Sequence, residues 1–202
     1  ERARGEMGDV VRRFPLYRWG WWQLLDWWEE DEAWEECREV LAEVHPATAA
    51  DPLFTARRLT LLELAGAPAD QLDPQWERAL HDFPDLLELH LRRVDLLLAR
   101  QEWDAAAALV AAQERFHADA TFLLARKVQA LAGGGRREEA LSAARTLWQL
   151  PGDAERWPEE AAWTALANAG LTRQAALEAW GLVARGSPLR LRAFELLLDH
   201  LG

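Results

Sequence analysis

A pair of adjacent basic residues recurs at intervals of 35 and 34 residues, and these side chains are the ones best suited to binding chemistry: Arg57-Arg58, Arg92-Arg93 and Arg126-Lys127. A guanidinium group binds a carboxylate or a phosphate through two parallel hydrogen bonds. If equivalent positions lie side by side in the fold, Arg57, Arg92 and Arg126 form one basic stripe. This spacing predicts a surface that binds acidic groups of a partner.

Neutralisation by neighbouring acidic residues is the alternative interpretation of these pairs. Glu88 and Asp95 stand within one helical turn of Arg92, close enough to neutralise it. Arg126 has no acidic residue within a turn along its own helix, and Arg57 has few nearby. The sequence therefore leaves both interpretations open, a partner-binding stripe and ordinary charged positions.

The residues that serve catalysis or metal binding form no recognisable site. Five histidines are scattered without metal-ligand spacing: His45, His81, His90, His117 and His200. Cys37 stands at a position that carries small residues in other parts of the chain, which predicts a buried thiol rather than a nucleophile. Gly133-Gly134-Gly135 follows a helix rather than a strand and is a turn, not a phosphate-binding loop. We expect no enzymatic activity, no metal and no cofactor.

Charge and hydropathy limit the classes of partner. The net charge is −11, whereas a nucleic-acid-binding face is normally basic, so we expect no nucleic-acid partner. The run from Asp26 to Glu43 contains nine acidic residues and only Arg38 to offset them. It is interpreted as a solvated helix face and turn, with a docking patch for a basic partner as the alternative. No apolar run of about 18 residues exists, so no membrane span is predicted.

Composition favours a helical protein. Leu, Ala, Glu, Arg and Trp dominate and Ile is absent, so strong helix formers outnumber residues that favour strands. The absence of Ile is typical of a GC-rich genome and points to a bacterium, and we expect a cytoplasmic location. The sequence begins with Glu1 in what reads as the middle of an element, which is the pattern expected for a piece of a longer protein.

A position that mostly carries small residues recurs every 34 or 35 residues along the chain: Cys37, Gln71, Ala106, Ala140 and Ala175. Glycine stands five residues earlier in three of these cases, at Gly66, Gly135 and Gly170. A period of this length indicates stacked supersecondary units in place of one globule. It predicts repeats at 18–51, 52–86, 87–120, 121–155 and 156–187, in a single domain spanning 1–202.

Each repeat is predicted to contain two amphipathic helices joined by a short turn. In the fourth repeat, Leu124, Val128 and Leu131 recur at helical spacing, the glycines end the first helix, and Glu138-Glu139 begin the second. In the second repeat two prolines predict a longer turn and a second helix delayed to about 74–82. The segment 188–200 is predicted to be a single helix that caps the stack.

These residues resemble the tetratricopeptide repeat family. Gly135-Arg136-Arg137-Glu138-Glu139-Ala140-Leu141 is similar to the family's turn and second-helix signature, and Trp21, Leu24 and Trp28 match its first-helix positions. The resemblance covers about 16–187. It implies an all-α, right-handed superhelical solenoid of about five helix-turn-helix repeats. It also implies a concave groove, lined by first helices, that binds a peptide or a partner protein.

The resemblance places two kinds of side chain on the groove. Arg57, Arg92 and Arg126 would supply its basic stripe. Trp21, Trp28 and Trp34 match core positions, which leaves other aromatic residues for the groove-facing side: Trp19, Trp22, Phe122 and Trp157. The alternative for Trp19 and Trp22 is that they pack against sequence upstream of this chain. The family's carboxylate-binding members use Lys and Asn at flanking positions that here are Trp22, Leu91 and Ala125, so no chaperone-tail clamp is predicted.

Three functions follow as hypotheses. The first is a monomeric protein-interaction module with a groove that is basic in its central repeats and aromatic in its first repeat. This groove would bind a partner that carries acidic or aromatic residues. The second is an accessory or assembly domain of a larger enzyme or complex, which packs through its Trp-rich N-terminal end. The third is a self-assembling structural protein, against which the polar cap helix at 188–200 argues.

Overall fold

The computed structural model describes residues 2–44, 46–117, 120–150, 157–182 and 193–195. All regular secondary structure in these residues is helical, which confirms the predicted all-α class. Backbone contacts divide the chain into two compact units, 1–93 and 94–202, and the boundary falls inside a helix.

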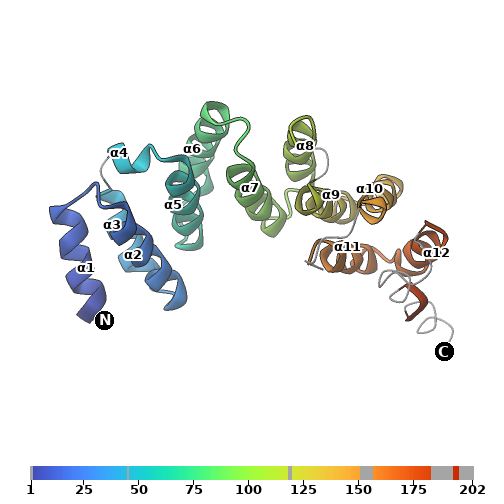
Figure 1. Ribbon diagram of the computed structural model, residues 1–202, viewed down its shortest axis with the longest axis horizontal. Helices are drawn as coiled ribbons and strands as arrows, with labels where there is room; N and C mark the ends of the chain where they lie inside the picture. The colour runs from blue at the N-terminus through green and yellow to red at the C-terminus, as the bar shows by residue number, and fades with distance from the viewer. Residues whose placement is uncertain (1, 45, 118–119, 151–156, 183–192, 196–202) are drawn as a thin grey trace. The chain divides into compact units, whose positions relative to one another are not determined.

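The first unit is built around one central helix. Its helices are α1 (Arg2–Arg13), α2 (Arg18–Glu30), α3 (Trp34–Ala42), α4 (Pro46–Ala49), α5 (Pro52–Leu64), α6 (Ala69–Asp82) and the beginning of α7 (Leu87–Ala99). Helix α5 packs against α2, α3, α4 and α6, and α1 packs against α2 (Figure 1). Helices that are neighbours in sequence are therefore neighbours in space.

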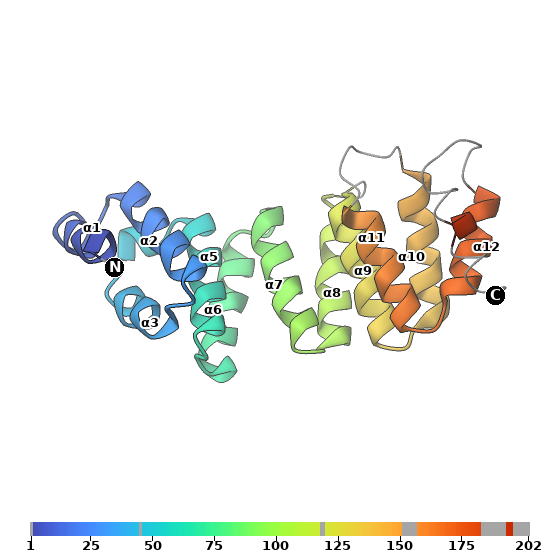
Figure 2. The ribbon, with the colours of Figure 1, turned by 90° about the horizontal axis from the view of Figure 1, so that it is seen from below.

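The second unit repeats this arrangement around α9. After the end of α7, its described helices are α8 (Trp103–Glu114), α9 (Thr121–Gly133), α10 (Arg137–Gln149), α11 (Trp157–Asn168) and α12 (Thr172–Leu182). Helix α9 packs against α8, α10 and α11, and α12 packs against α10 and α11 (Figure 2). Each helix again lies beside its neighbours in the chain.

Four helices begin at the residues at which the sequence predicts repeat starts: Arg18, Pro52, Leu87 and Thr121. The start of α5 has a clear local cause. Asp51 precedes it, and the Asp51 side chain accepts a hydrogen bond of 2.9 Å from the Phe54 N–H, while Pro52 supplies a helical φ at the first position. The predicted cap helix at 188–200 lies outside the described residues except for 193–195, which are helical.

One turn geometry joins the two helices of each successive pair. The residue five positions before the small-residue position has a positive φ in every case: Glu32, Gly66, Gln101, Gly135 and Gly170. The next residue's N–H donates to the carbonyl five residues earlier at 2.8–3.0 Å, for example Arg136 to Leu131 and Leu171 to Leu166. This is the Schellman motif, which satisfies helix-end carbonyls through a left-handed residue.

The second repeat differs from the others by one residue in this turn. Helix α6 begins three residues after the left-handed residue, whereas α3, α8, α10 and α12 begin two residues after theirs. The buried position on the second helix therefore moves by one residue along the sequence. Leu72 is 2 % exposed, whereas Gln71 is exposed. The buried residues at the fourth position of their helices are therefore Cys37, Leu72, Ala106, Ala140 and Ala175, and Gln71 is not one of them.

Helix α6 is also longer than the sequence predicts. It begins at Ala69 instead of near Pro74, so Pro74 lies inside the helix. Proline lacks the N–H that would bond to the carbonyl four residues earlier, which normally disfavours this position. Burial outweighs that loss here, because Leu72 and Trp76 are 2 % and 0 % exposed and anchor the helix on both sides of Pro74.

The three glycines at the end of α9 do not share one role. Only Gly135 is left-handed, with φ of 74°. Gly133 closes α9, and a Cβ there would lie 2.7 Å from Cε3 of the Trp103 ring. The missing side chain therefore allows the indole of α8 to lie against the end of α9, a close approach that glycine permits.

Glycine is expected to stabilise the two left-handed positions that lack it. In Glu32 and Gln101 the Cβ opposes the left-handed conformation by about 1–2 kcal/mol, partly offset by the greater unfolded-state entropy of glycine. We expect Glu32→Gly and Gln101→Gly each to raise the free energy of unfolding by about 0.5–1 kcal/mol. Urea denaturation followed by circular dichroism measures this change.

Gly135→Ala is the matched control for these substitutions. A Cβ at Gly135 meets no atom within 4 Å, so only the backbone preference changes there. We expect a loss of about 1 kcal/mol. Equal stability of all three variants and the parent protein would contradict the assignment of these residues to a shared left-handed turn.

Candidate functional site

The first members of the three basic pairs occupy one helical position. Arg57, Arg92 and Arg126 are the sixth residues of α5, α7 and α9, and each lies five residues before the carbonyl that closes the following turn. Their ionic contacts differ, however, because the first helix of the preceding repeat supplies a carboxylate to Arg57 and to Arg126 but not to Arg92.

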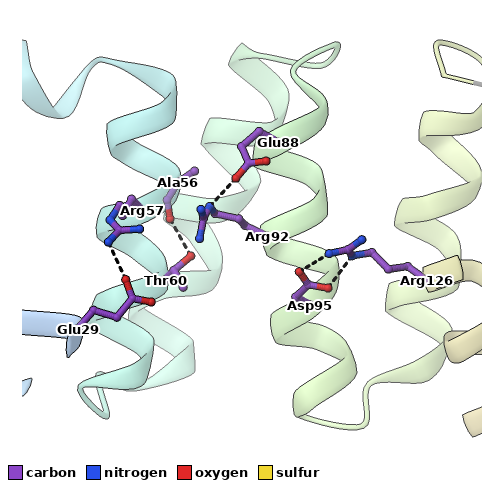
Figure 3. A network of polar contacts seen from close by, with 8 residues as sticks. All are labelled: Glu29, Ala56, Arg57, Thr60, Glu88, Arg92, Asp95 and Arg126. Atoms are coloured by element: carbon purple, nitrogen blue, oxygen red, sulfur yellow. Dashed lines mark hydrogen bonds and ion pairs between the residues drawn. The ribbon is translucent and has the colours of Figure 1, made fainter. Parts of the chain in front are cut away.

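Arg57 is held by two carboxylates of α2. Its Nη2 atom lies 2.5 Å from Asp26 Oδ1 and 2.6 Å from Glu29 Oε2, and its side chain is 14 % exposed. The guanidinium also lies 5.7 Å from the centre of the Trp22 ring, within the range of a cation–π contact. Arg57 thus joins the first helices of two successive repeats (Figure 3).

Arg126 makes the corresponding contact in the second unit. Its Nε and Nη2 atoms donate to both oxygens of Asp95, at 2.6 and 2.7 Å, and Nη1 donates to the Phe122 carbonyl at 3.1 Å. The Arg126 side chain is 10 % exposed. This bidentate pair joins α9 to α7 (Figure 3). Asp26 and Asp95 stand at the ninth position of their helices, 31 residues before the arginines they bind.

Arg92 lacks such a carboxylate. The ninth position of α5 is Thr60, whose hydroxyl donates to the Ala56 carbonyl of its own helix at 2.9 Å. Arg92 Nε instead donates to Glu88 of its own helix at 2.9 Å, and its side chain is 33 % exposed. Figure 3 shows Arg92 extending from α7 toward α5.

The second members of the pairs bond to residues on second helices. Arg93 Nη2 lies 2.7 Å from Asp73 of α6, and its guanidinium lies 5.7 Å from the Trp76 ring centre. Lys127 Nζ lies 2.6 Å from Glu114 of α8. Arg58 donates to Gln75 of α6, and burial lowers the pKa of its guanidinium. The Arg57-Arg58 and Arg126-Lys127 pairs therefore each form hydrogen bonds to two other helices, whereas in the described residues the Arg92-Arg93 pair forms them to one.

These intramolecular contacts are what sequence reasoning missed. Spacing along one helix reveals only acidic residues within a turn of each arginine, whereas Asp26 and Asp95 are 31 residues from theirs. The available signal was the recurrence of Asp at the ninth helical position of two repeats. The role of Arg57, Arg92 and Arg126 in partner binding stays a prediction, and of the three Arg92 is the most exposed.

The tryptophans separate into core and surface residues. Trp21 and Trp28 are 1 % and 5 % exposed, as expected for core positions, and Trp34 packs against the same cluster while partly buried. Trp22 is half-buried against the edge of Phe54, with ring centres 6.1 Å apart. Trp19 is 58 % exposed.

Trp19 belongs to an aromatic turn between α1 and α2. We use this name for Phe14, Leu16, Tyr17 and Trp19, whose exposed fractions are 56 %, 64 %, 41 % and 58 %. The Tyr17 and Trp19 rings lie 6.0 Å apart. The turn is anchored from inside, because the Pro15 carbonyl accepts hydrogen bonds from Trp21 Nε1 at 3.0 Å and Thr48 Oγ1 at 2.7 Å. A fixed backbone thus presents four large apolar side chains to solvent.

The two remaining aromatic candidates do not join this turn. Phe122 is half-buried on α9, in the second unit, and its carbonyl accepts the hydrogen bond from Arg126. Trp157 begins α11, and its side chain lies outside the described part of the structure. Trp19 and Trp22 are therefore brought together on α2, while Phe122 lies in the other unit.

Cys37 occupies the buried position that its sequence context predicts. The side chain is 0 % exposed at the fourth residue of α3, and burial raises the pKa of the thiol to about 12, partly countered by Arg57. A thiol with a raised pKa and no solvent access is a poor nucleophile.

Other site chemistry is sparse in the described residues. They contain no cluster of three His, Cys, Asp or Glu side chains placed to hold a metal ion. A pocket of about 290 Å³ lies among α8, α9 and α10, and its Lys127 and Glu139 side chains already pair with Glu114 and Arg136. No helix in the described residues has the length and apolar character needed to cross a membrane.

Comparisons with known proteins add no assignment. The chain matches no protein-family model, no curated protein and no solved structure.

Proposed function

We propose that this chain is a protein-interaction module in which tetratricopeptide-like helix pairs stack as a right-handed solenoid and bind a partner protein or peptide. The stacking is supported by the recurring left-handed turns and by the contacts between successive helix pairs within each unit. Such stacks present extended surfaces that suit the binding of a partner.

The observation that carries this proposal is the aromatic turn. Exposed large apolar side chains that gather in one place are typical of interaction sites, and Trp and Tyr are enriched among the residues that dominate binding energy. The turn has a fixed backbone, so little conformational entropy is lost when a partner covers it. We propose that Trp19 and Tyr17 are its central contacts.

Partner capture tests the proposal. The parent chain and a Tyr17→Ser/Trp19→Ser variant are used as baits in a lysate of the source organism, beside Leu177→Ser as control. Leu177 is 54 % exposed on α12 and matches Trp19 in exposure. We expect a protein that binds the parent chain and the Leu177 variant to be lost from the aromatic-turn variant. Equal capture by all three baits would contradict a role for the turn.

A second candidate function is an accessory or assembly domain of a larger enzyme or complex. The exposure of four large apolar side chains in one short turn favours it, because a permanent interface would keep that surface covered. Dilution separates the two functions. A partner of an interaction module dissociates and exchanges, whereas a subunit of a permanent assembly stays bound through size-exclusion chromatography at nanomolar concentration.

A further inference from the structure

The ion pairs between first helices leave one arginine without its cross-repeat partner. Asp26 binds Arg57 and Asp95 binds Arg126, in each case from the ninth position of one first helix to the sixth position of the next. Between α5 and α7 the same two positions hold Thr60 and Arg92. The interval there is 32 residues instead of 31, because the turn after Gly66 has one extra residue.

Thr60 cannot replace the missing carboxylate. Its hydroxyl is uncharged and is already directed to the Ala56 carbonyl. Within the described residues, Arg92 is bonded only through Nε, to Glu88, and its terminal Nη1 and Nη2 atoms make no hydrogen bond. Two donors of a partly exposed guanidinium group are therefore available in the fork geometry that suits a carboxylate.

We propose that Arg92 binds a carboxylate of the partner, an Asp or Glu side chain, in the place that Asp26 and Asp95 occupy for the other two arginines. This inference rests on the proposed interaction function and adds the chemistry of one contact. The partner's carboxylate thus supplies to Arg92 the kind of ion pair that Arg57 and Arg126 form with carboxylates of this chain.

The surrounding charge sets the conditions for this contact. Glu88 neutralises part of the Arg92 charge, and the net charge of −11 repels acidic partners at a distance. Repulsion from distant charges is screened beyond about 8 Å at physiological ionic strength, whereas a direct bidentate contact is screened much less. The contact is therefore favoured at physiological salt and not at low salt.

Thr60→Asp is the sharpest test, because it restores the missing carboxylate within the chain. Gln129→Asp is its matched control. Gln129 stands at the same ninth position on α9 and is half-buried like Thr60. On α11 the residue equivalent to the arginines, nine residues before the left-handed Gly170, is Ala161. Both substitutions add one negative charge, and only Thr60→Asp has an arginine to bind.

The probe is a tetraglutamate peptide with an N-terminal fluorophore and an amidated C-terminus, measured by fluorescence anisotropy at physiological salt beside the same tetraglutamine peptide. We expect the parent chain to prefer tetraglutamate, and Arg92→Gln to weaken its binding about tenfold, the factor for a hydrogen bond to a charged group. Thr60→Asp should weaken it as much while raising the unfolding temperature. Gln129→Asp should keep binding within about twofold, as other surface substitutions do.

Several outcomes would overturn the inference. They are binding of tetraglutamate and tetraglutamine with equal affinity by the parent chain, unchanged binding by Arg92→Gln, or equal losses in Thr60→Asp and Gln129→Asp. Arg92→Gln keeps the test valid if Thr60→Asp fails to fold. The proposed function is tested separately by the aromatic turn: a captured partner that depends on Trp19 but not on Arg92 would remove this inference and leave the interaction module standing.

Discussion

Replacing Trp21 with alanine is expected to lower the free energy of unfolding of the first unit by about 3–5 kcal/mol, which is a large fraction of the roughly 5–15 kcal/mol typical of a folded protein. Trp21 is 1 % exposed, its Nε1 donates to the Pro15 carbonyl at 3.0 Å, and its ring packs edge-to-face with Phe54, with the ring centres 6.2 Å apart. The substitution leaves a large cavity and removes one of the two hydrogen bonds to the Pro15 carbonyl, which keeps its bond from Thr48. Urea denaturation followed by tryptophan fluorescence measures the loss.

Trp19→Ala is the control for this prediction, two residues away on the same helix. Because the Trp19 side chain is 58 % exposed, we expect its removal to change stability by no more than about 0.5 kcal/mol. A loss as large as that of Trp21→Ala would mean that Trp19 is a core residue, and it would remove the main support for the aromatic turn as a binding surface.

The second large effect is expected at the Asp95–Arg126 pair. Asp95→Ala removes both carboxylate oxygens from a guanidinium that is 10 % exposed and keeps its bond to the Phe122 carbonyl. We expect a loss of about 2 kcal/mol, below the 3–5 kcal/mol of a fully buried pair, because Asp95 is half exposed and water can reach the arginine. Chemical denaturation of the second unit measures it.

Glu88→Ala supplies the comparison for Asp95→Ala. It breaks the Arg92–Glu88 pair, which lies within one helix and is exposed to solvent at both ends. Pairs of this kind contribute about 0.3–0.5 kcal/mol. If the two substitutions cost the same, the cross-repeat pair has no special importance for the stacking of α7 and α9.

The turns were the most predictable part of the fold. Gly66, Gly135 and Gly170 mark left-handed positions because glycine has no Cβ to oppose that conformation, and the structure places all three there. Glu32 and Gln101 adopt the same conformation without any local signal, and only the period of 34 or 35 residues points to them. Long-range regularity thus carried information that residue type did not.

Helix α6 shows where local rules failed. Pro74 predicts a helix start by its own chemistry, yet the helix begins five residues earlier. Burial of the Leu72 and Trp76 side chains stabilises the helix by more than the one hydrogen bond lost at Pro74 costs. The handedness of the stack and the number of its repeats remain predictions. Neither follows from the contacts within the two units.

The candidate site was predictable in its residues and not in their partners. The equivalent positions of Arg57 and Arg126 on their own helices follow from spacing alone. Their bonds to Asp26 and Asp95 depend on how closely one helix pair approaches the next, which no pattern within a single helix encodes. Exposure of Trp19 was expected, whereas the packing of Trp22 under Arg57 was not.

The longer turn after Gly66 shows that the length of a repeat can change without a change in its helix packing. One extra residue changes the interval between successive first helices from 34 to 35, yet Leu72 is still buried at the fourth position of its helix. Additional residues are thus absorbed outside the helices. For protein engineering, the Ala67–Pro68 junction is the preferred insertion point for an epitope tag or a fluorescent label, since the Ala67 N–H keeps its bond to the Leu62 carbonyl and the Pro68 carbonyl keeps its bonds to the start of α6.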